Sequence, residues 1–513
     1  MNRVESKSTY ERRKSREKTA IPLNEKITLK RHIGLFSGIT FIIGMIIGSG
    51  IFISPKGVLR ETQSVGLCLI IWIICGFVAL LSALCYAEIG TVIPLSGAEL
   101  AYMKEGNCTI NYGTVDQSIC NIGIGSVHAR TGDILAFVFS WANTFIILPS
   151  TAAILTLTFS TYFLSGIMDN CGPPAELVKM TAIFAIVVLA NVNAFSVTAA
   201  NRLNIVFTLC KVVTILVIVT AGLVRIGQGY TENLKHSFHG TTNKPLRIAL
   251  AFYSGLWAYS GWGSLTTVTE ELKNPKKNLW LSIVVALPIV IVLYVLTNIS
   301  YFTVMTKSAL LSSNAVAMTW GEVVLGSVAR VLPILIALSA LGSANGLTYT
   351  SARYCMVSAR YGYLPEIFSY IQKQRLTPLP GIIFQTILAI IYCIPSDIEG
   401  LINYFSFVSW LFCGLTFVAT LCCKFTKRDV LRLIKVPIPL VIFIILISIY
   451  LVIAPVISYP NIGFLIASII LLLSLIVYYI FIFRQVQPKF MKKLNGSIEN
   501  FFNLTKSDIN IET

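Results

Sequence analysis

The chain has 513 residues, of which 55% are apolar and only 12% are charged. A soluble protein of this length carries roughly a quarter of its residues as charged side chains, so this composition excludes an ordinary water-soluble enzyme and indicates lipid as the solvent. The net charge of +17 does not indicate nucleic acid, because the basic residues gather in the tails and in the loops of one side of the membrane.

Twelve apolar stretches approach or exceed the roughly 20 residues that a helix needs to cross a bilayer. They lie at 33–55, 62–87, 134–163, 180–201, 203–224, 248–269, 279–305, 331–352, 376–396, 400–423, 436–457 and 461–483. We therefore predict an all-α membrane protein with one transporter domain at 33–484, between a basic tail at 1–32 and a second tail at 485–513. Residues 1–32 do not resemble a signal peptide, and the positive-inside rule places both tails in the cytoplasm.

The first span contains three glycines within seven residues, at Gly44, Gly48 and Gly50. Each costs a helix about 1 kcal/mol relative to alanine. A close-packing face explains Gly44 and Gly48, but it does not explain Gly48, Ser49 and Gly50 in succession near midspan. An unwound turn there exposes backbone N–H groups beside a positive helix end, which suits a carboxylate.

Cysteine and histidine give no sign of a metal site, and we expect no cofactor. The twelve cysteines have no zinc-ligand spacing, and the insertion at 104–132 is better interpreted as a flexible loop. Cys171 differs, because the topology places its loop outside. An intermolecular disulfide is favoured there over an unpaired surface thiol.

Lys211 is the one charged residue in the fifth span, where burial costs several kcal/mol. It is either a lysine that extends to the interface or a fixed positive charge between the fifth span and the broken first span. A sodium-coupled carrier would place its ion at that second position.

The sixth span is also interrupted. Gly255, Gly261 and Gly263 weaken a short segment that is rich in aromatic residues. A packed aromatic cluster is the alternative, but paired breaks five spans apart are the best sequence indication of a transporter's binding site. Unwound carbonyls at 257–260 would suit an ammonium, so the two breaks together describe an α-amino acid.

At these residues the chain resembles a known family, the light subunits of heteromeric amino-acid transporters. These are the L-type exchangers of the amino acid–polyamine–organocation superfamily. The matching segments cover nearly the whole of 25–485 and include 46–59, 83–91, 257–262, 269–278, 341–346, 362–365 and 405–410.

The resemblance implies a LeuT-like fold, with spans 1–5 and 6–10 as inverted repeats and helices 1 and 6 interrupted. It implies sodium-independent exchange at the plasma membrane, with Lys211 in the place of sodium. The implied substrate contacts are the backbone of Ser49, Gly50 and Ile51 for the carboxylate and the carbonyls of Trp257, Ala258 and Ser260 for the amine. Trp257 is also the implied outer gate. Cys171 is the implied disulfide link to a single-span glycoprotein heavy subunit.

The side-chain pocket carries no acid. Relatives that take cationic substrates often have an acidic residue at the sixth-span break, where this chain has Ser260 and Gly263. Large neutral amino acids are therefore favoured, admitted by Gly263 and Ser409, and cationic ones remain an open alternative. A uniporter without a heavy subunit and a channel are further alternatives. An enzyme is disfavoured, because all four histidines lie outside the spans or at an edge.

Overall fold

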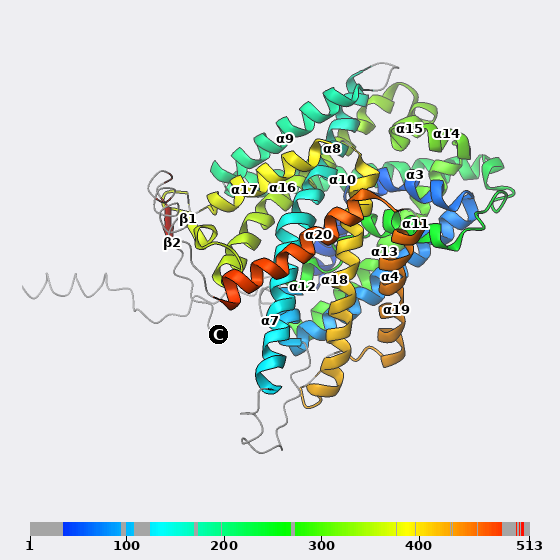
Figure 1. The fold of residues 1–513 in the computed structure, drawn as a ribbon. Coiled ribbons are helices and arrows are strands. Elements are labelled where there is room, and N and C mark those ends of the chain that lie inside the picture. The colour runs from blue at the N-terminus through cyan, green and yellow to red at the C-terminus, as the bar shows by residue number, and fades with distance from the viewer. Residues whose placement is uncertain are drawn as a thin grey trace, which may run out of the picture.

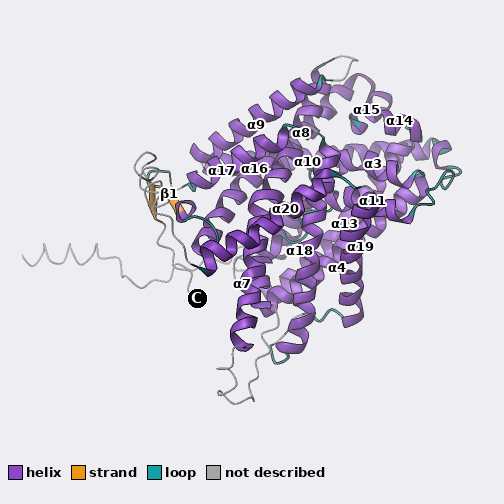
Figure 2. Ribbon diagram, in the orientation of Figure 1, coloured by secondary structure: helices purple, strands orange, loops and turns teal. Residues whose placement is uncertain are grey.

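The computed structural model describes residues 34–93, 99–106, 124–168, 173–195, 197–267, 272–375, 377–395, 397–430, 432, 434–458 and 460–484, with 499, 502 and 504–506 near the C-terminus. This part of the chain is almost entirely helical, and its helices pack side by side into one bundle (Figures 1 and 2).

Nine helical segments within the described residues are long and apolar enough to cross a membrane. They are α4 (Val65–Val92), α7 (Ile124–Ala142) with the π-helix Asn143–Ile147 and α8 (Leu148–Ile167), α9 (Ala175–Phe195), α10 (Val197–Gly227), α13 (Pro275–Phe302), α16 (Val331–Arg360), α18 (Ile398–Thr426), α19 (Ile438–Ser458), and α20 (Ile462–Val477) with the π-helix Tyr478–Phe483.

Three further segments are broken or short. The first is the pair α2 (Leu35–Ile46) and α3 (Gly50–Thr62), which are bent by 52° at the residues between them. The second is α11 (Pro245–Ala258), a turn, and α12 (Ser264–Thr267). The third is α17 (Leu379–Cys393). Together with the nine, they correspond to the twelve predicted spans, and the predicted multi-span helical fold is confirmed.

The remaining elements lie between or after the spans. They are α5 (Glu99–Gly106), α14 (Lys307–Ser312), α15 (Val316–Leu325), three short 3-10 helices (Glu232–Leu234, Gly326–Arg330 and Glu366–Ser369) and the strands β1 (Tyr370–Gln372) and β2 (Leu504–Lys506). The strands pair antiparallel, with Tyr370 opposite Lys506. The sequence did not predict this ribbon, which attaches the end of the chain to the loop between α16 and α17.

Two half-helices determine where the site lies. α3 and α11 pack against each other in opposite directions, with Gly50 against Ala258 near the breaks and Gly57 against Ser254 further along. Glycine is needed at Gly50, because a Cβ there would overlap the backbone of Ala258. Helices α3 and α11, which form one half of span one and one half of span six, therefore lie antiparallel, as inverted repeats require, although the full repeat stays a prediction.

Candidate functional site

The first break exposes backbone donors. Helix α2 ends at Ile46 and α3 begins at Gly50. The N–H groups of Phe52 and Ile53 both bond to Ser49 O, whereas those of Gly48 to Ile51 have no acceptor among the described residues. Ser49 is 1% exposed, and its hydroxyl also has no partner there. Buried donors without acceptors are rare in folded proteins, so this turn is suited to a bound carboxylate.

The second break exposes carbonyls, but fewer than the sequence predicts. Ser260 N–H donates to Trp257 O at 3.0 Å, so that carbonyl is already in use. The carbonyls of Tyr259 and Ser260 accept no hydrogen bond within the described part of the chain. These two groups, rather than those of Trp257 and Ala258, are the freest acceptors for an ammonium.

The two breaks touch. Besides the Gly50–Ala258 contact, Gly261 lies against the end of α2, where an added Cβ would be 2.9 Å from Met45 O. Gly261 has a φ of +105°, a conformation that glycine adopts without strain. The free N–H groups of one break and the free carbonyls of the other are therefore neighbours, as the α-carboxylate and α-ammonium of one amino acid require.

Tyr294 on α13 holds both breaks, and the sequence did not reveal this. Its hydroxyl is 3.0 Å from Ile46 O and 3.0 Å from Ala258 O, the last carbonyls of α2 and α11. Tyr294 is fully buried and packs against Trp72 and Tyr259. A tyrosine within an apolar span needs a partner for its hydroxyl, and that is the signal in the sequence that could have identified it.

Trp257 lies where a gate over the breaks is expected. Its ring meets that of Phe405 on α18 edge to face, with centroids 4.9 Å apart. It is buried in a small apolar cluster with residues of α8 and α18, including Ile154 and Ile402. Its indole N–H has no partner among the described residues. The contact with Phe405 closes the space between spans six and ten.

The predicted side-chain pocket lies on the side of the Trp257–Phe405 contact that faces the breaks. Phe405, Ser409 and Cys413 follow one face of α18, because they are four residues apart. Cys413 accepts a hydrogen bond from the Tyr86 hydroxyl at 3.6 Å, and a Cβ on Gly263 would be 3.8 Å from the Tyr86 ring. Ser409 therefore lies between the Trp257 level and the Gly263 level, and both small residues leave room there.

Lys211 is buried beside the first break. It is 6% exposed, and its Nζ donates to Ser343 Oγ on α16 at 2.8 Å. A Cβ on Gly48 would be 3.4 Å from that same oxygen, so the Ser343 hydroxyl lies between the Lys211 ammonium and the first break. Among the described residues, no carboxylate pairs with Lys211. The structure thus favours a fixed internal charge over a lysine that extends to the interface.

Two acids, Glu88 and Glu99, lie near the end of α4 and at the start of α5. Glu88 on α4 is fully buried and binds Lys424, Arg432 Nη1 at 2.8 Å and Val436 N–H at 3.0 Å. It joins span two to the segment between spans ten and eleven, as a gate network would. Glu99 on α5 was missed by the sequence analysis, and burial raises its pKa, against hydrogen bonds to the Tyr86 hydroxyl and its own backbone.

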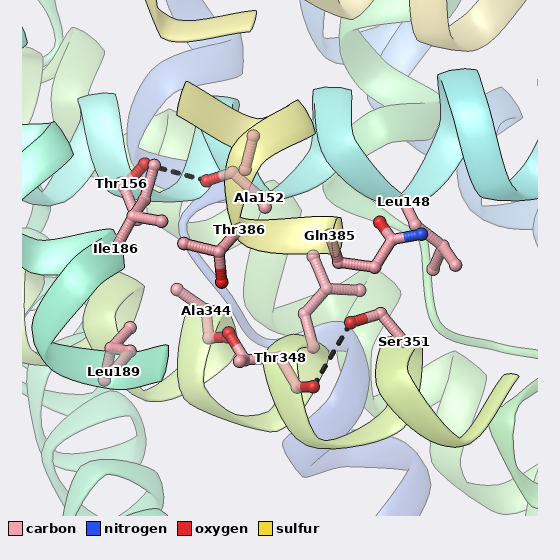
Figure 3. A pocket seen from close by; sticks show the side chains of 12 residues that line it. Leu148, Ala152, Thr156, Ile186, Leu189, Ala344, Thr348, Ser351, Gln385 and Thr386 are labelled. Atoms are coloured by element: carbon pink, nitrogen blue, oxygen red, sulfur yellow. Dashed lines mark hydrogen bonds between the residues drawn. The ribbon is translucent and has the colours of Figure 1, made fainter. Parts of the chain in front are cut away.

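Several predicted features lie outside the described residues, among them Cys171 and most of the insertion at 104–132. A pocket between spans three, four, eight and nine is described, and Figure 3 shows Thr156, Thr348, Ser351 and Gln385 around it. It has a volume of about 20 Å³, close to that of one water molecule. It contains none of the predicted site residues, and we assign it to packing.

Comparisons with known proteins find relatives over nearly the whole chain. The model of the amino acid permease family matches residues 33–483. The chain is 44% identical over 479 residues to the b(0,+)-type amino acid transporter 1 of Mus musculus, covering 93% of each protein. It is 37% identical to the human cystine/glutamate transporter, covering 93% of this chain and 90% of the relative. It is 36% identical to the mouse Asc-type amino acid transporter 1, covering 93% and 86% respectively.

Proposed function

The chain belongs to the amino acid permease family, and from this premise we propose that it is a sodium-independent exchanger of large neutral amino acids in the plasma membrane. The observation that carries the proposal is the contact of the two breaks at Gly50 and Ala258. This contact supports a site in which unpaired N–H groups of the first break lie beside unpaired carbonyls of the second. We place both termini in the cytoplasm, which the distribution of basic residues supports.

The backbone of the substrate is recognised by backbone groups of the chain. The N–H groups of Gly48, Ser49, Gly50 and Ile51 bind the α-carboxylate, helped by the positive end of α3. At the second break, the carbonyls of Tyr259 and Ser260 bind the α-ammonium, because those of Trp257 and Ala258 already accept hydrogen bonds. No charged side chain is needed for either contact.

The side chain of the substrate occupies the space bounded by Trp257, Gly263 and Ser409. The two small residues admit a large side chain, and no acid lines the breaks. This composition supports neutral substrates over cationic ones. Trp257 acts as the outer gate, because its contact with Phe405 must open before a substrate can enter from that side.

Lys211 supports independence from sodium. Its ammonium lies one hydroxyl away from the first break, so a cation bound there would be repelled by it. A uniporter is the alternative mechanism, and the charge at Lys211 favours exchange over it, because a substrate carboxylate at the first break compensates that charge. A channel is less well supported, because a conducting pore needs a continuous polar lining.

We propose that Cys171 joins the chain to a single-span glycoprotein heavy subunit. The topology and the resemblance to light subunits support this partner. In cells, non-reducing gels should show a high-mass band that collapses with reductant and is absent from Cys171→Ser. Cys210→Ser, at a partly buried thiol within α10, is the control that should keep the band. A band that survives Cys171→Ser removes the assignment.

The deciding experiment is efflux of labelled L-leucine from proteoliposomes, with each of the twenty amino acids added outside in turn. Large neutral amino acids should stimulate efflux, and choline should replace sodium without effect. Stimulation by lysine or arginine would add cationic substrates. No stimulation by any amino acid would remove the exchanger proposal, and equal efflux with nothing outside would favour the uniporter.

A further inference from the structure

A charged cavity opens at the ends of α3 and α11 that point away from the breaks. Its volume is about 420 Å³, within the range of small-molecule sites. Its charged lining comes from three spans of the chain. These residues are Arg60 and Glu61 of span one, Arg247 of span six, and Asp397 and Glu399 at the start of span ten.

The cavity and the candidate site lie at opposite ends of the same two half-helices, α3 and α11. Arg60 is ten residues beyond Gly50 on α3, and Arg247 is ten residues before Trp257 on α11. At 1.5 Å per residue, both positions are about 15 Å from the breaks. Along α11, Trp257 lies between Arg247 and the second break, and its ring contacts Phe405 on α18. By the positive-inside rule, the cavity faces the outside of the cell.

Some charged residues of the cavity form ion pairs, and others do not. Arg60 is shared, because its Nε lies 3.2 Å from Glu61 Oε1 and its Nη1 binds Glu399. Arg247 and Asp397 are both exposed, and neither has an ion-pair partner among the described residues. One free guanidinium and one free carboxylate therefore line the same cavity.

We propose that this cavity is an outer docking site for the zwitterion of an α-amino acid. Arg247 binds the α-carboxylate, and Asp397 binds the α-ammonium. The Arg60–Glu399 pair closes the cavity between α3 and α18. A substrate held here is concentrated at the closed Trp257 gate, before the midplane site is accessible. The proposal rests on the proposed amino-acid exchange, and it adds a second site that acts from one side only.

This one-sidedness makes the proposal testable. In cells expressing the full chain, the half-saturating concentration of L-leucine is measured outside by uptake and inside by stimulated efflux after injection. Arg247→Gln and Asp397→Asn should each raise the outside value about threefold to fivefold, the size of a partly exposed charged contact. The inside value should not change, because the cavity does not face that side. Lys244→Gln, an exposed residue one position before α11 that does not line the cavity, is the matched control.

A double variant separates docking from a general effect of charge. Arg247→Gln with Asp397→Asn leaves the net charge of the cavity unchanged. If the single variants acted only through the local field, the double variant would return to the wild-type outside value. Docking predicts that the half-saturating concentration outside stays raised in the double variant. Arg247→Lys, which keeps the positive charge, should bind L-leucine more tightly from outside than Arg247→Gln does.

Besides a double variant that returns to the wild-type value, two results would overturn the proposal. One is an unchanged outside value in all three variants, and the other is an equal change on both sides, which would indicate an effect on the midplane site. Surface biotinylation confirms that each variant reaches the membrane in wild-type amounts. Absence of exchange by the wild-type chain would instead count against the proposed function, so the two failures are distinguishable.

Discussion

Replacing Tyr294 with phenylalanine tests whether the two breaks act as one site. The hydroxyl of Tyr294 is the donor that both Ile46 O and Ala258 O share, at 3.0 Å each. Its removal leaves two buried carbonyls with no other donor recorded among the described residues, and it changes the shape of the side chain by a single oxygen. We expect the breaks to lose their fixed separation and the substrate to bind more weakly.

The size of the effect follows from the hydrogen bonds. An unsatisfied buried acceptor costs about 1–3 kcal/mol, and one proton serves one of the two carbonyls at a time. The loss should therefore be about 1–3 kcal/mol in total, or about 5- to 150-fold in the half-saturating concentration of L-leucine. Both sides of the membrane should be affected equally, because the midplane site serves both. Uptake and stimulated efflux, measured as for the outer docking site, check this.

Tyr301 provides the matched control on the same helix. It is fully buried like Tyr294, but its hydroxyl has no hydrogen-bond partner among the described residues. Tyr301→Phe removes the same atom without breaking a bond, so transport and thermal stability should stay at the wild-type level or improve slightly. If Tyr294→Phe transports like Tyr301→Phe, the bridge between the breaks has no functional role and our reasoning is wrong.

Three further substitutions give expected outcomes. Gly50→Ala places a Cβ against the backbone of Ala258, and overpacking of about 1–3 kcal/mol should cut L-leucine exchange at least fivefold. Lys211→Met should keep the fold but raise efflux without outside amino acid relative to stimulated efflux, because a buried methionine needs no counter-charge. Burial raises the pKa of Glu99, so its carboxyl is protonated in the folded chain at pH values where it ionises in the unfolded one. The apparent Tm should therefore fall as pH rises from about 4.5 to the raised pKa, and Glu99→Gln should lack that part of the fall.

Each of these has its own control and contrary result. Gly227→Ala adds a methyl group with no atom within 4 Å, so it should transport normally where Gly50→Ala does not. Retained exchange in Gly50→Ala would show that the backbones can separate. An unchanged ratio of the two effluxes in Lys211→Met would remove the link between that charge and exchange. Identical pH profiles for Glu99→Gln and the wild-type chain would show that Glu99 does not titrate in this range.

The breaks could be predicted because glycine has few reasons to occupy midspan. Gly50 and Gly261 each have a cause in the structure, a backbone contact and a positive φ. The backbone contact and the positive φ each act on the glycine itself, so the requirement for glycine is visible in the sequence. Lys211 could be predicted for a similar reason, since an isolated charge in an apolar span is too costly without a role.

The partners of these residues could not be predicted, because they come from distant parts of the chain. Ser343 is 132 residues from Lys211, and Lys424 is 336 residues from Glu88. Tyr294 belongs to a span that also contains Ser282, Thr297, Asn298, Ser300 and Tyr301, and periodicity does not show which of these polar side chains meets the breaks. The sequence also suggested the carbonyl of Trp257 as an acceptor, but a tight turn uses it for Ser260 N–H.

The position of Lys211 gives a physical reason for exchange rather than free diffusion of the empty carrier. A bound sodium ion can leave after the substrate, whereas a lysine cannot. When the site is empty, the buried Lys211 ammonium donates to the Ser343 hydroxyl, and no carboxylate among the described residues pairs with it. In an occluded state without substrate, that ammonium stays buried with no counter-charge, which is unfavourable. A substrate carboxylate at the first break lies next to the Ser343 hydroxyl that binds Lys211. Its negative charge compensates much of the cost of burying the ammonium. The loaded carrier therefore crosses its barrier faster than the empty one, and this difference in rate is what makes a carrier an exchanger.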